Sequence, residues 1–151
     1  MNEYLDIQPE MEKGIFTKIE AEVWGAISGR LKCFFVRLSL VERLSPELFT
    51  TLLGDDSELQ EEFNQHCNFV SFNKYINAYL IHHLFLDFLC TKHHLLSDTE
   101  KYETYKMAAC WSEQNGFLAD ALNYYEKIGD HQSKKAVEEK ITRRILDNQV
   151  A

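Results

Sequence analysis

The hydrophobic positions of the chain recur mainly at the spacing of an amphipathic helix. The first stripe begins near Ile15, and its members lie three or four residues apart: Ile19, Val23, Ile27, Leu31, Phe34 and Leu38. Ser28-Gly29 interrupts this stripe, and a glycine inside a helix costs about 1 kcal/mol relative to alanine. The pattern therefore predicts two helices, over about 16–27 and 30–41, with a break between them.

Two short helices are predicted next. Ser45 is a favourable N-cap, Pro46 suits the first helical position, and Gly54 is a favourable helix end. The first of the two therefore covers about 46–53. The second begins after Ser57 and directs three residues inward: Leu59, Phe63 and Cys67.

A segment rich in β-branched and aromatic residues follows, NFVSFNKYINAYLIHH. Asn73-Lys74 and Asn77 supply residues typical of turns, so we expect a β-hairpin with strands at about 69–72 and 77–81. An isolated hairpin is marginal in water and must pack on the neighbouring helices. Three helices followed by a hairpin form the winged-helix arrangement.

The helical period returns at His83 and continues to the end of the chain. An apolar stripe of Leu84, Phe85, Phe88 and Leu89 extends to Leu95 and Leu96. Ser97 and Glu100 fit a capping box, which marks the start of a new helix. We expect the last three helices at about 99–115, 117–129 and 131–148.

These elements predict a mainly α fold with one small β-hairpin. A winged-helix-like domain would cover residues 1–96, with a boundary near 96–99. Residues 97–151 would begin a domain of antiparallel helical hairpins similar to tetratricopeptide (TPR) repeats. Only one and a half such units are present, and solenoids of this kind usually need about three for stability.

Charge and composition exclude several classes of function. The 151 residues include 24 acidic and 16 basic side chains, for a net charge of −8. Proteins that bind phosphate backbones or anionic lipids carry a surplus of lysine and arginine, which this chain lacks. We therefore expect neither general nucleic-acid binding nor docking on a membrane. No run of 18 apolar residues is present, so no membrane span is expected.

The N-terminal residues and the cysteines indicate the cellular compartment that we expect for the protein. The sequence begins MNEYLDIQPEMEK, without the basic start and apolar stretch of a secretory signal. The four cysteines lie at least 20 residues apart, which rules out a CxxC pair or zinc-knuckle spacing: Cys33, Cys67, Cys90 and Cys110. We interpret them as reduced thiols of a cytoplasmic protein.

No catalytic motif is found. The sequence lacks GxxxxGK[ST], GxGxxG, GxSxG and HExxH, and no local pattern supplies a base for a nucleophilic cysteine. We therefore expect that the chain is not an enzyme. His83 and Asp87, at i and i+4, have the spacing of two metal ligands on one helical face. The set is incomplete, so we interpret the histidines around this helix as a surface or strand-end cluster: His82, His83, His93 and His94.

The aromatic residues are interpreted as core rather than as a ligand pocket. Six phenylalanines recur at helical or alternating spacing: Phe34, Phe35, Phe69, Phe72, Phe85 and Phe88. The region where a winged helix reads DNA, DDSELQEEFNQHCNF, is acidic and has no lysine or arginine, and the hairpin contributes only Lys74. A contact with protein, within or between chains, fits this segment better than a contact with DNA.

Three segments together resemble a known family. They are FFVRLSLVERLSPELFTTLLG (34–54), NFVSFNKYINAYLIHHLFLDFL (68–89) and YKMAACWSEQNGFLADALNYYEKIGD (105–130). They look like the large MalT-like transcription regulators of the LuxR type, which are built on a signalling ATPase of the STAND class. In that family a nucleotide-binding domain precedes a winged-helix domain, a helical-repeat sensor and a DNA-binding helix-turn-helix. The resemblance covers about 31–130, and residues 1–28 contribute little to it.

The resemblance implies one site residue, His82. In STAND ATPases a histidine at the end of the winged-helix strand contacts the β-phosphate of ADP and helps to hold the resting state. An imidazole N–H is a suitable donor to a diphosphate oxygen. The resemblance implies ATP or ADP as a cofactor of the full-length protein, and it implies no cofactor for this chain alone. The contact of His82 with ADP therefore requires the upstream ATPase domain.

The resemblance also implies the partners of the chain. They are intramolecular, namely the upstream nucleotide-binding domain and the downstream sensor repeats, and DNA is contacted only through a domain absent from this sequence. Leu86 replaces the basic residue that usually follows HHLF in the family. The alternative is a stand-alone helical interaction module that self-associates or binds a partner through the incomplete repeat edge near Lys134–Leu146.

Overall fold

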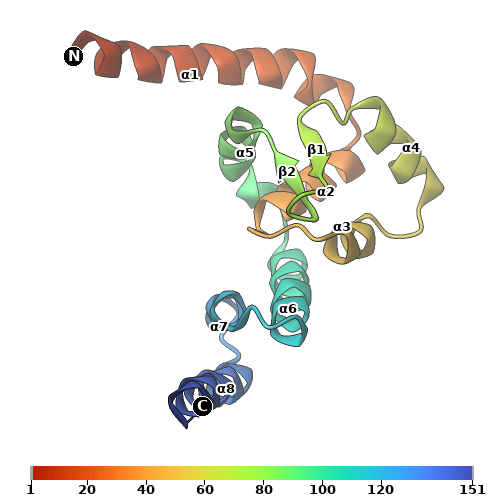
Figure 1. The fold of residues 1–151 in the computed structure, drawn as a ribbon. Coiled ribbons are helices and arrows are strands. Elements are labelled where there is room, and N and C mark those ends of the chain that lie inside the picture. Colours follow the sequence, from red (N-terminus) through yellow and green to blue (C-terminus); the bar gives the residue numbers. More distant parts are fainter. Residues whose placement is uncertain (1, 151) are drawn as a thin grey trace. The chain divides into compact units, whose positions relative to one another are not determined.

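The computed structural model describes residues 2–150, with side chains described for residues 11–148. Figure 1 shows the order of the elements along the chain. The first part contains α1 (Asn2–Glu22), the 3-10 turn η1 (Trp24–Ala26), α2 (Gly29–Ser39), α3 (Pro46–Leu53), α4 (Ser57–Gln65), β1 (Val70–Asn73) and β2 (Ala78–Ile81). It is followed by α5 (His83–Cys90), the 3-10 turn η2 (His93–Leu95), α6 (Asp98–Gln114), α7 (Leu118–Lys127) and α8 (His131–Val150).

The fold is mainly helical, as the sequence predicted. Within the described residues the only sheet is the antiparallel pair β1–β2, which confirms the single hairpin. The internal contacts divide the chain into two compact units, with the division between Leu96 and Ser97.

The first helix differs from the prediction at both ends. The apolar stripe predicted a helix over about 16–27, whereas α1 extends from Asn2 to Glu22. The stripe could not reveal the first turns, because they show no continuous apolar face and include Pro9 and Gly14, which disfavour a helix interior. At the other end, Trp24–Ala26 form a 3-10 turn in which Trp24 is buried. The predicted break is present, because Ser28 caps α2 by accepting a hydrogen bond from the Leu31 N–H at 3.2 Å.

The core of the first unit is centred on α2, whose inward face carries large apolar side chains. Phe35 is 1% exposed and meets Phe85 of α5 edge to face at 5.2 Å between ring centroids. Phe34 contacts Phe49 of α3 and Phe63 of α4 in the same geometry, at 5.5 and 5.7 Å. Aromatic pairs in this arrangement add to the stabilisation that burial gives. The helices α2–α5 therefore share one aromatic core.

The helix α3 matches its prediction. Ser45 accepts a hydrogen bond from the Leu48 N–H at 3.1 Å, and Pro46 occupies the first turn. Gly54, at φ +73°, ends the helix in a conformation that side chains disfavour. The next helix, α4, begins at Ser57 and is capped by Asp56.

The hairpin lies where the sequence placed it. Val70 pairs with Ile81 and Phe72 with Tyr79. The Tyr79 ring stacks on the Phe49 ring at 3.9 Å between centroids. The backbone N–H of Tyr79 donates to the Leu44 carbonyl at 2.8 Å. These contacts attach the hairpin to the helical core. The interpretation of Phe72 as core is wrong, because its side chain is 48% exposed on the hairpin.

The apolar stripe after His83 belongs to more than one element. The helix α5 ends at Cys90 and the turn η2 follows, so Leu95 and Leu96 do not continue its face. Leu96 is buried, whereas Leu95 is exposed. A 3-10 turn changes the direction of the chain within three residues, which a helical period does not reveal.

The second unit consists of α6, α7 and α8, and α7 packs against both of the others. The predicted capping box is present at the start of α6. Ser97 accepts from the Glu100 N–H at 3.1 Å, and the Glu100 carboxylate accepts from the Ser97 N–H at 3.0 Å. Gly116, at φ +85°, lies in the turn from α6 to α7, and a Cβ there would lie 3.1 Å from the Arg144 side chain. The positive φ of this turn therefore favours glycine, and a Cβ there would also require the Arg144 side chain to shift slightly.

Candidate functional site

His82 lies at the junction between the hairpin and α5. Its N–H donates to the Phe69 carbonyl at 2.7 Å, which extends the pairing of the two strands by one residue. Its carbonyl accepts from the Leu86 N–H at 2.9 Å, which begins the hydrogen bonding of α5. The backbone of His82 is therefore fixed by a strand on one side and a helix on the other.

The His82 ring caps α5. Nδ1 accepts a hydrogen bond from the Leu84 N–H at 3.3 Å, and the side chain is exposed. A ring nitrogen that accepts a hydrogen bond carries no proton, so the neutral ring carries its proton on Nε2. The helix thereby selects the tautomer and leaves Nε2–H as the donor available to a ligand.

The four histidines of the predicted surface cluster do not lie together around one helix. His82 and His83 stand at the start of α5, with their rings stacked at 4.7 Å. His93 and His94 belong to η2, beyond the other end of α5, and His93 Nε2 lies 3.1 Å from the Ser39 hydroxyl. Across the described part of the chain, no three His, Cys, Asp or Glu side chains are grouped closely enough to hold a metal ion.

A small cavity adjoins His82. Its volume is about 210 Å³, and it lies between α1, the start of β1 and the start of α5. Its walls are mainly apolar, and Lys18 and Glu22 of α1 also line it. Sequence reasoning found His82 but not the cavity, because the cavity depends on α1 packing against α5.

A second, more open cavity of about 660 Å³ lies between α1 and the end of α5. Phe16 and Phe88 line it and meet edge to face at 5.8 Å. Lys92 lies 5.3 Å from the Phe88 ring and forms an ion pair with Glu20 at 2.8 Å. These contacts fasten the C-terminal end of α5 to α1.

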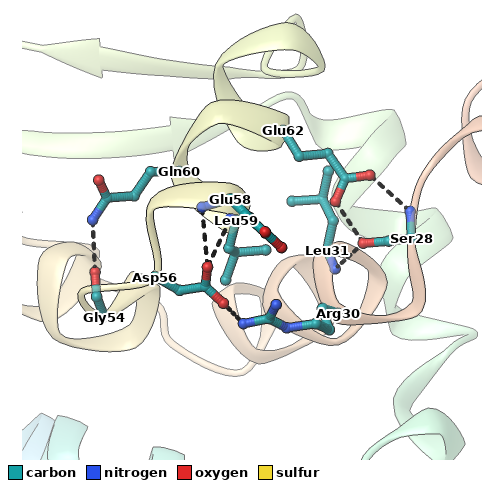
Figure 2. A network of polar contacts seen from close by, with 9 residues as sticks. All are labelled: Ser28, Arg30, Leu31, Gly54, Asp56, Glu58, Leu59, Gln60 and Glu62. Carbon is teal, nitrogen blue, oxygen red and sulfur yellow. Dashed lines mark hydrogen bonds and ion pairs between the residues drawn. The ribbon is translucent and has the colours of Figure 1, made fainter.

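A polar network joins the start of α2 to α4 (Figure 2). The Glu62 carboxylate accepts from both the N–H and the hydroxyl of Ser28, the former at 2.9 Å. The hydrogen bond from the Ser28 hydroxyl is the main cause that lowers the pKa of Glu62 below its ordinary value. Asp56 forms an ion pair with Arg30 and accepts from the Glu58 N–H at 3.0 Å. Two acids of the supposed DNA-reading segment thus hold α4 to α2.

The Ser28 cap provides a test of this network. We expect Ser28→Ala to lower the free energy of unfolding by about 1 kcal/mol, because α2 loses its N-cap and Glu62 loses a donor. Ser57→Ala is the matched control, since Ser57 also starts a helix but leaves the capping to Asp56. Urea denaturation of both variants measures the difference. Equal losses in the two variants would contradict the assigned role of Ser28.

In the second unit the polar contacts converge on Glu113 of α6. Its carboxylate accepts from the Tyr125 hydroxyl at 3.0 Å and forms an ion pair with Lys140. The hydrogen bond from Lys140 is the largest cause that lowers the pKa of Glu113. Arg144 donates to the Gly116 carbonyl at 3.0 Å. These contacts attach α8 to the preceding helical hairpin.

None of the four cysteines forms a disulfide within the part of the chain that the structure describes. Cys110 Sγ lies 3.7 Å from the Tyr125 hydroxyl. No helix in residues 2–150 is long and apolar enough to cross a membrane.

Comparisons of the chain with protein-family models, with curated proteins and with solved structures give no significant match.

Proposed function

We propose that the chain is a non-catalytic regulatory module of a MalT-like, ATP-dependent regulator of the LuxR type. Residues 1–96 would form its winged-helix-like domain, and residues 97–151 would begin its TPR-like sensor domain. The module would couple the nucleotide state of an upstream ATPase domain to inducer sensing in downstream repeats. It would reach DNA only through a further domain of the full-length protein.

The placement of His82 is the observation that carries this proposal. The family resemblance implies a histidine at the end of the winged-helix strand, and His82 follows β2 directly. The order α2, α3, α4, β1, β2 is also the order of elements in a winged helix. The short turn from α6 to α7 makes these helices antiparallel neighbours, as in a helical-hairpin repeat.

Electrostatics favour a protein-facing role for the first unit. Asp55, Glu58 and Glu61 are exposed on and beside α4, where a winged helix would meet DNA. Phosphates would be repelled by this surface. A contact with another domain of the same regulator fits the charge better.

The proposed action of His82 is a single hydrogen bond. In the resting protein Nε2–H would donate to a β-phosphate oxygen of ADP held by the ATPase domain. Inducer binding would rotate the winged-helix-like domain and remove this donor, in a two-state domain motion. The α5 cap prepares the ring for this role, because it fixes both the tautomer and the ring orientation before ADP binds.

The test uses His82→Asn in the full-length regulator. Asparagine is a favourable N-cap, so α5 keeps its cap, but its shorter side chain loses the Nε2–H donor. We expect ADP to bind about tenfold more weakly, because a hydrogen bond to a charged oxygen is lost. Transcription without inducer should rise. ADP affinity is measured by calorimetry and transcription by a promoter reporter.

His83→Asn is the matched control, since His83 is also exposed at the start of α5 but does not cap it. It should leave ADP affinity and inducer control unchanged. The proposal would be wrong if His82→Asn left ADP affinity unchanged and kept transcription dependent on inducer.

One observation favours the alternative of a stand-alone interaction module. Ile145 and Leu146 on α8 are 55% and 54% exposed, at the edge where a complete solenoid would add its next helix. If the chain self-associates through this edge, Ile145→Lys with Leu146→Lys should convert a dimer into a monomer in analytical ultracentrifugation. A wild-type chain that is monomeric and retains no partner in pull-downs would count against this alternative.

A further inference from the structure

We propose that the cavity beside His82 binds a free α-amino acid with an apolar side chain. The site lies wholly within the first unit, between α1, the start of β1 and the start of α5. Its walls and its size do not depend on the proposed ADP contact, although both proposals use the same Nε2–H of His82 as a donor. Three features argue for it: the apolar walls, the paired charges at the rim, and the size.

The walls are built by two elements that face each other. Ile15 and Ile19 come from one face of α1, and Val23 follows the end of that helix. Phe69 and Leu84 come from the hairpin entry and the first turn of α5. Ile19 is buried, and the other four are partly exposed. An apolar ligand group in this cavity would remove that exposed surface from water, which is favourable.

The rim carries both signs of charge. Lys18 and Glu22 lie one turn apart on α1, and both are exposed at the cavity. His82, on the opposite side, offers Nε2–H because Nδ1 is occupied by the Leu84 N–H. Lys18 and His82 are donors suited to a carboxylate, and Glu22 is an acceptor suited to an ammonium group. A zwitterion matches this set, because it carries both a carboxylate and an ammonium group. A simple acid would leave Glu22 without a cationic partner, and a simple amine would leave Lys18 without an anionic partner.

The size limits the ligand to a small molecule. The volume of about 210 Å³ lies below the roughly 300–1,000 Å³ of pockets for drug-sized ligands. Leucine, isoleucine and phenylalanine are small enough for it. With about ten non-hydrogen atoms and an exposed rim, we expect a Kd on the order of 1 mM.

The test is an NMR titration of the full 151-residue chain with L-leucine. We expect amide shifts at Lys18–Val23 and at His82–Leu84, where the cavity walls lie. N-acetyl-L-leucine lacks the ammonium group and L-leucinamide lacks the carboxylate, so each should bind about threefold to tenfold more weakly. L-serine, which lacks the apolar side chain, should produce no shifts at these positions.

Two variants test which charged side chain binds which charged group of the amino acid. Glu22→Gln should remove the preference for leucine over N-acetyl-leucine, and Lys18→Gln should remove the preference over leucinamide. Glu12→Gln and Lys13→Gln are matched controls, because these residues lie on the same helix but line the other cavity. They should change neither preference.

Two results would overturn the inference. One is the absence of shifts at these positions up to about 20 mM leucine, well above the expected Kd. The other is equal binding of leucine and N-acetyl-leucine to the wild-type chain. Neither result bears on ADP, because the ADP experiment uses the full-length regulator and a different substitution.

Discussion

Phe35→Ala is expected to lower the free energy of unfolding of the first unit by about 3–5 kcal/mol. Phe35 is 1% exposed and contacts the rings of Phe34, Phe63 and Phe85. The substitution removes the transfer energy of the ring and leaves a cavity that three rigid neighbours cannot fill. A domain of this size is stable by about 5–15 kcal/mol, so this one change removes a large part of its stability.

The measurement uses the tryptophan of the first unit. Trp24 is buried there and Trp111 lies in the second unit, so a Trp111→Phe background isolates the Trp24 signal during urea denaturation. Phe72→Ala is the matched control, because it removes the same side chain from a position that is 48% exposed. We expect a loss below about 1 kcal/mol in that variant. Similar losses in the two variants would show that α2 does not centre the core.

The regular elements could be predicted because their signals are local. The apolar face of α2, the Ser45–Gly54 caps of α3, the hairpin and the Ser97–Glu100 capping box all lie within a few residues of sequence. The early part of α1 has no apolar stripe to reveal it. The turns η1 and η2 fit neither helical nor strand period.

The site could be predicted only in part, because its contacts join distant segments. The resemblance singled out His82, but its role as the cap of α5 appears only in the geometry. The Ser28–Glu62 link spans 34 residues, and a serine or a glutamate alone gives no sign of its partner. The cavity walls likewise combine residues 15–23 with Phe69, His82 and Leu84, much later in the sequence.

The cap on α5 connects stability with the proposed function. A residue that both caps a helix and contacts a ligand makes any simple deletion ambiguous, because His82→Ala would remove the two roles together. Asparagine separates them, since its carbonyl oxygen retains the cap while its amide N–H groups, on a shorter side chain, do not extend as far as Nε2–H of His82. The same separation applies to the amino-acid site, where Lys18 and Glu22 carry charge without supporting the core.

The second large effect is expected at Glu113, where Glu113→Ala should lower the stability of the second unit by about 2 kcal/mol. The Tyr125 residue is 5% exposed, so its hydroxyl would be left without the charged acceptor that now lies at 3.0 Å. The ion pair with Lys140 adds less, because the Lys140 side chain is 49% exposed. Trp111 fluorescence in a Trp24→Phe background reports this unit, and Glu126→Ala, at an exposed acid of α7, is the control.

The pH dependence of the Glu113 contribution identifies its charge as the cause. Its pKa is held below the ordinary value of 4.5, mainly by the hydrogen bond from Lys140. A carboxyl whose pKa is lower in the folded state stabilises the fold above its ordinary pKa and loses this contribution as the pH falls through the lowered value. The difference in unfolding free energy between wild type and Glu113→Gln should therefore be largest at neutral pH and shrink below pH 4.5. A difference that stayed constant over this range would show that Glu113 acts through its shape and neutral hydrogen bonding, and that α8 is not held by charge.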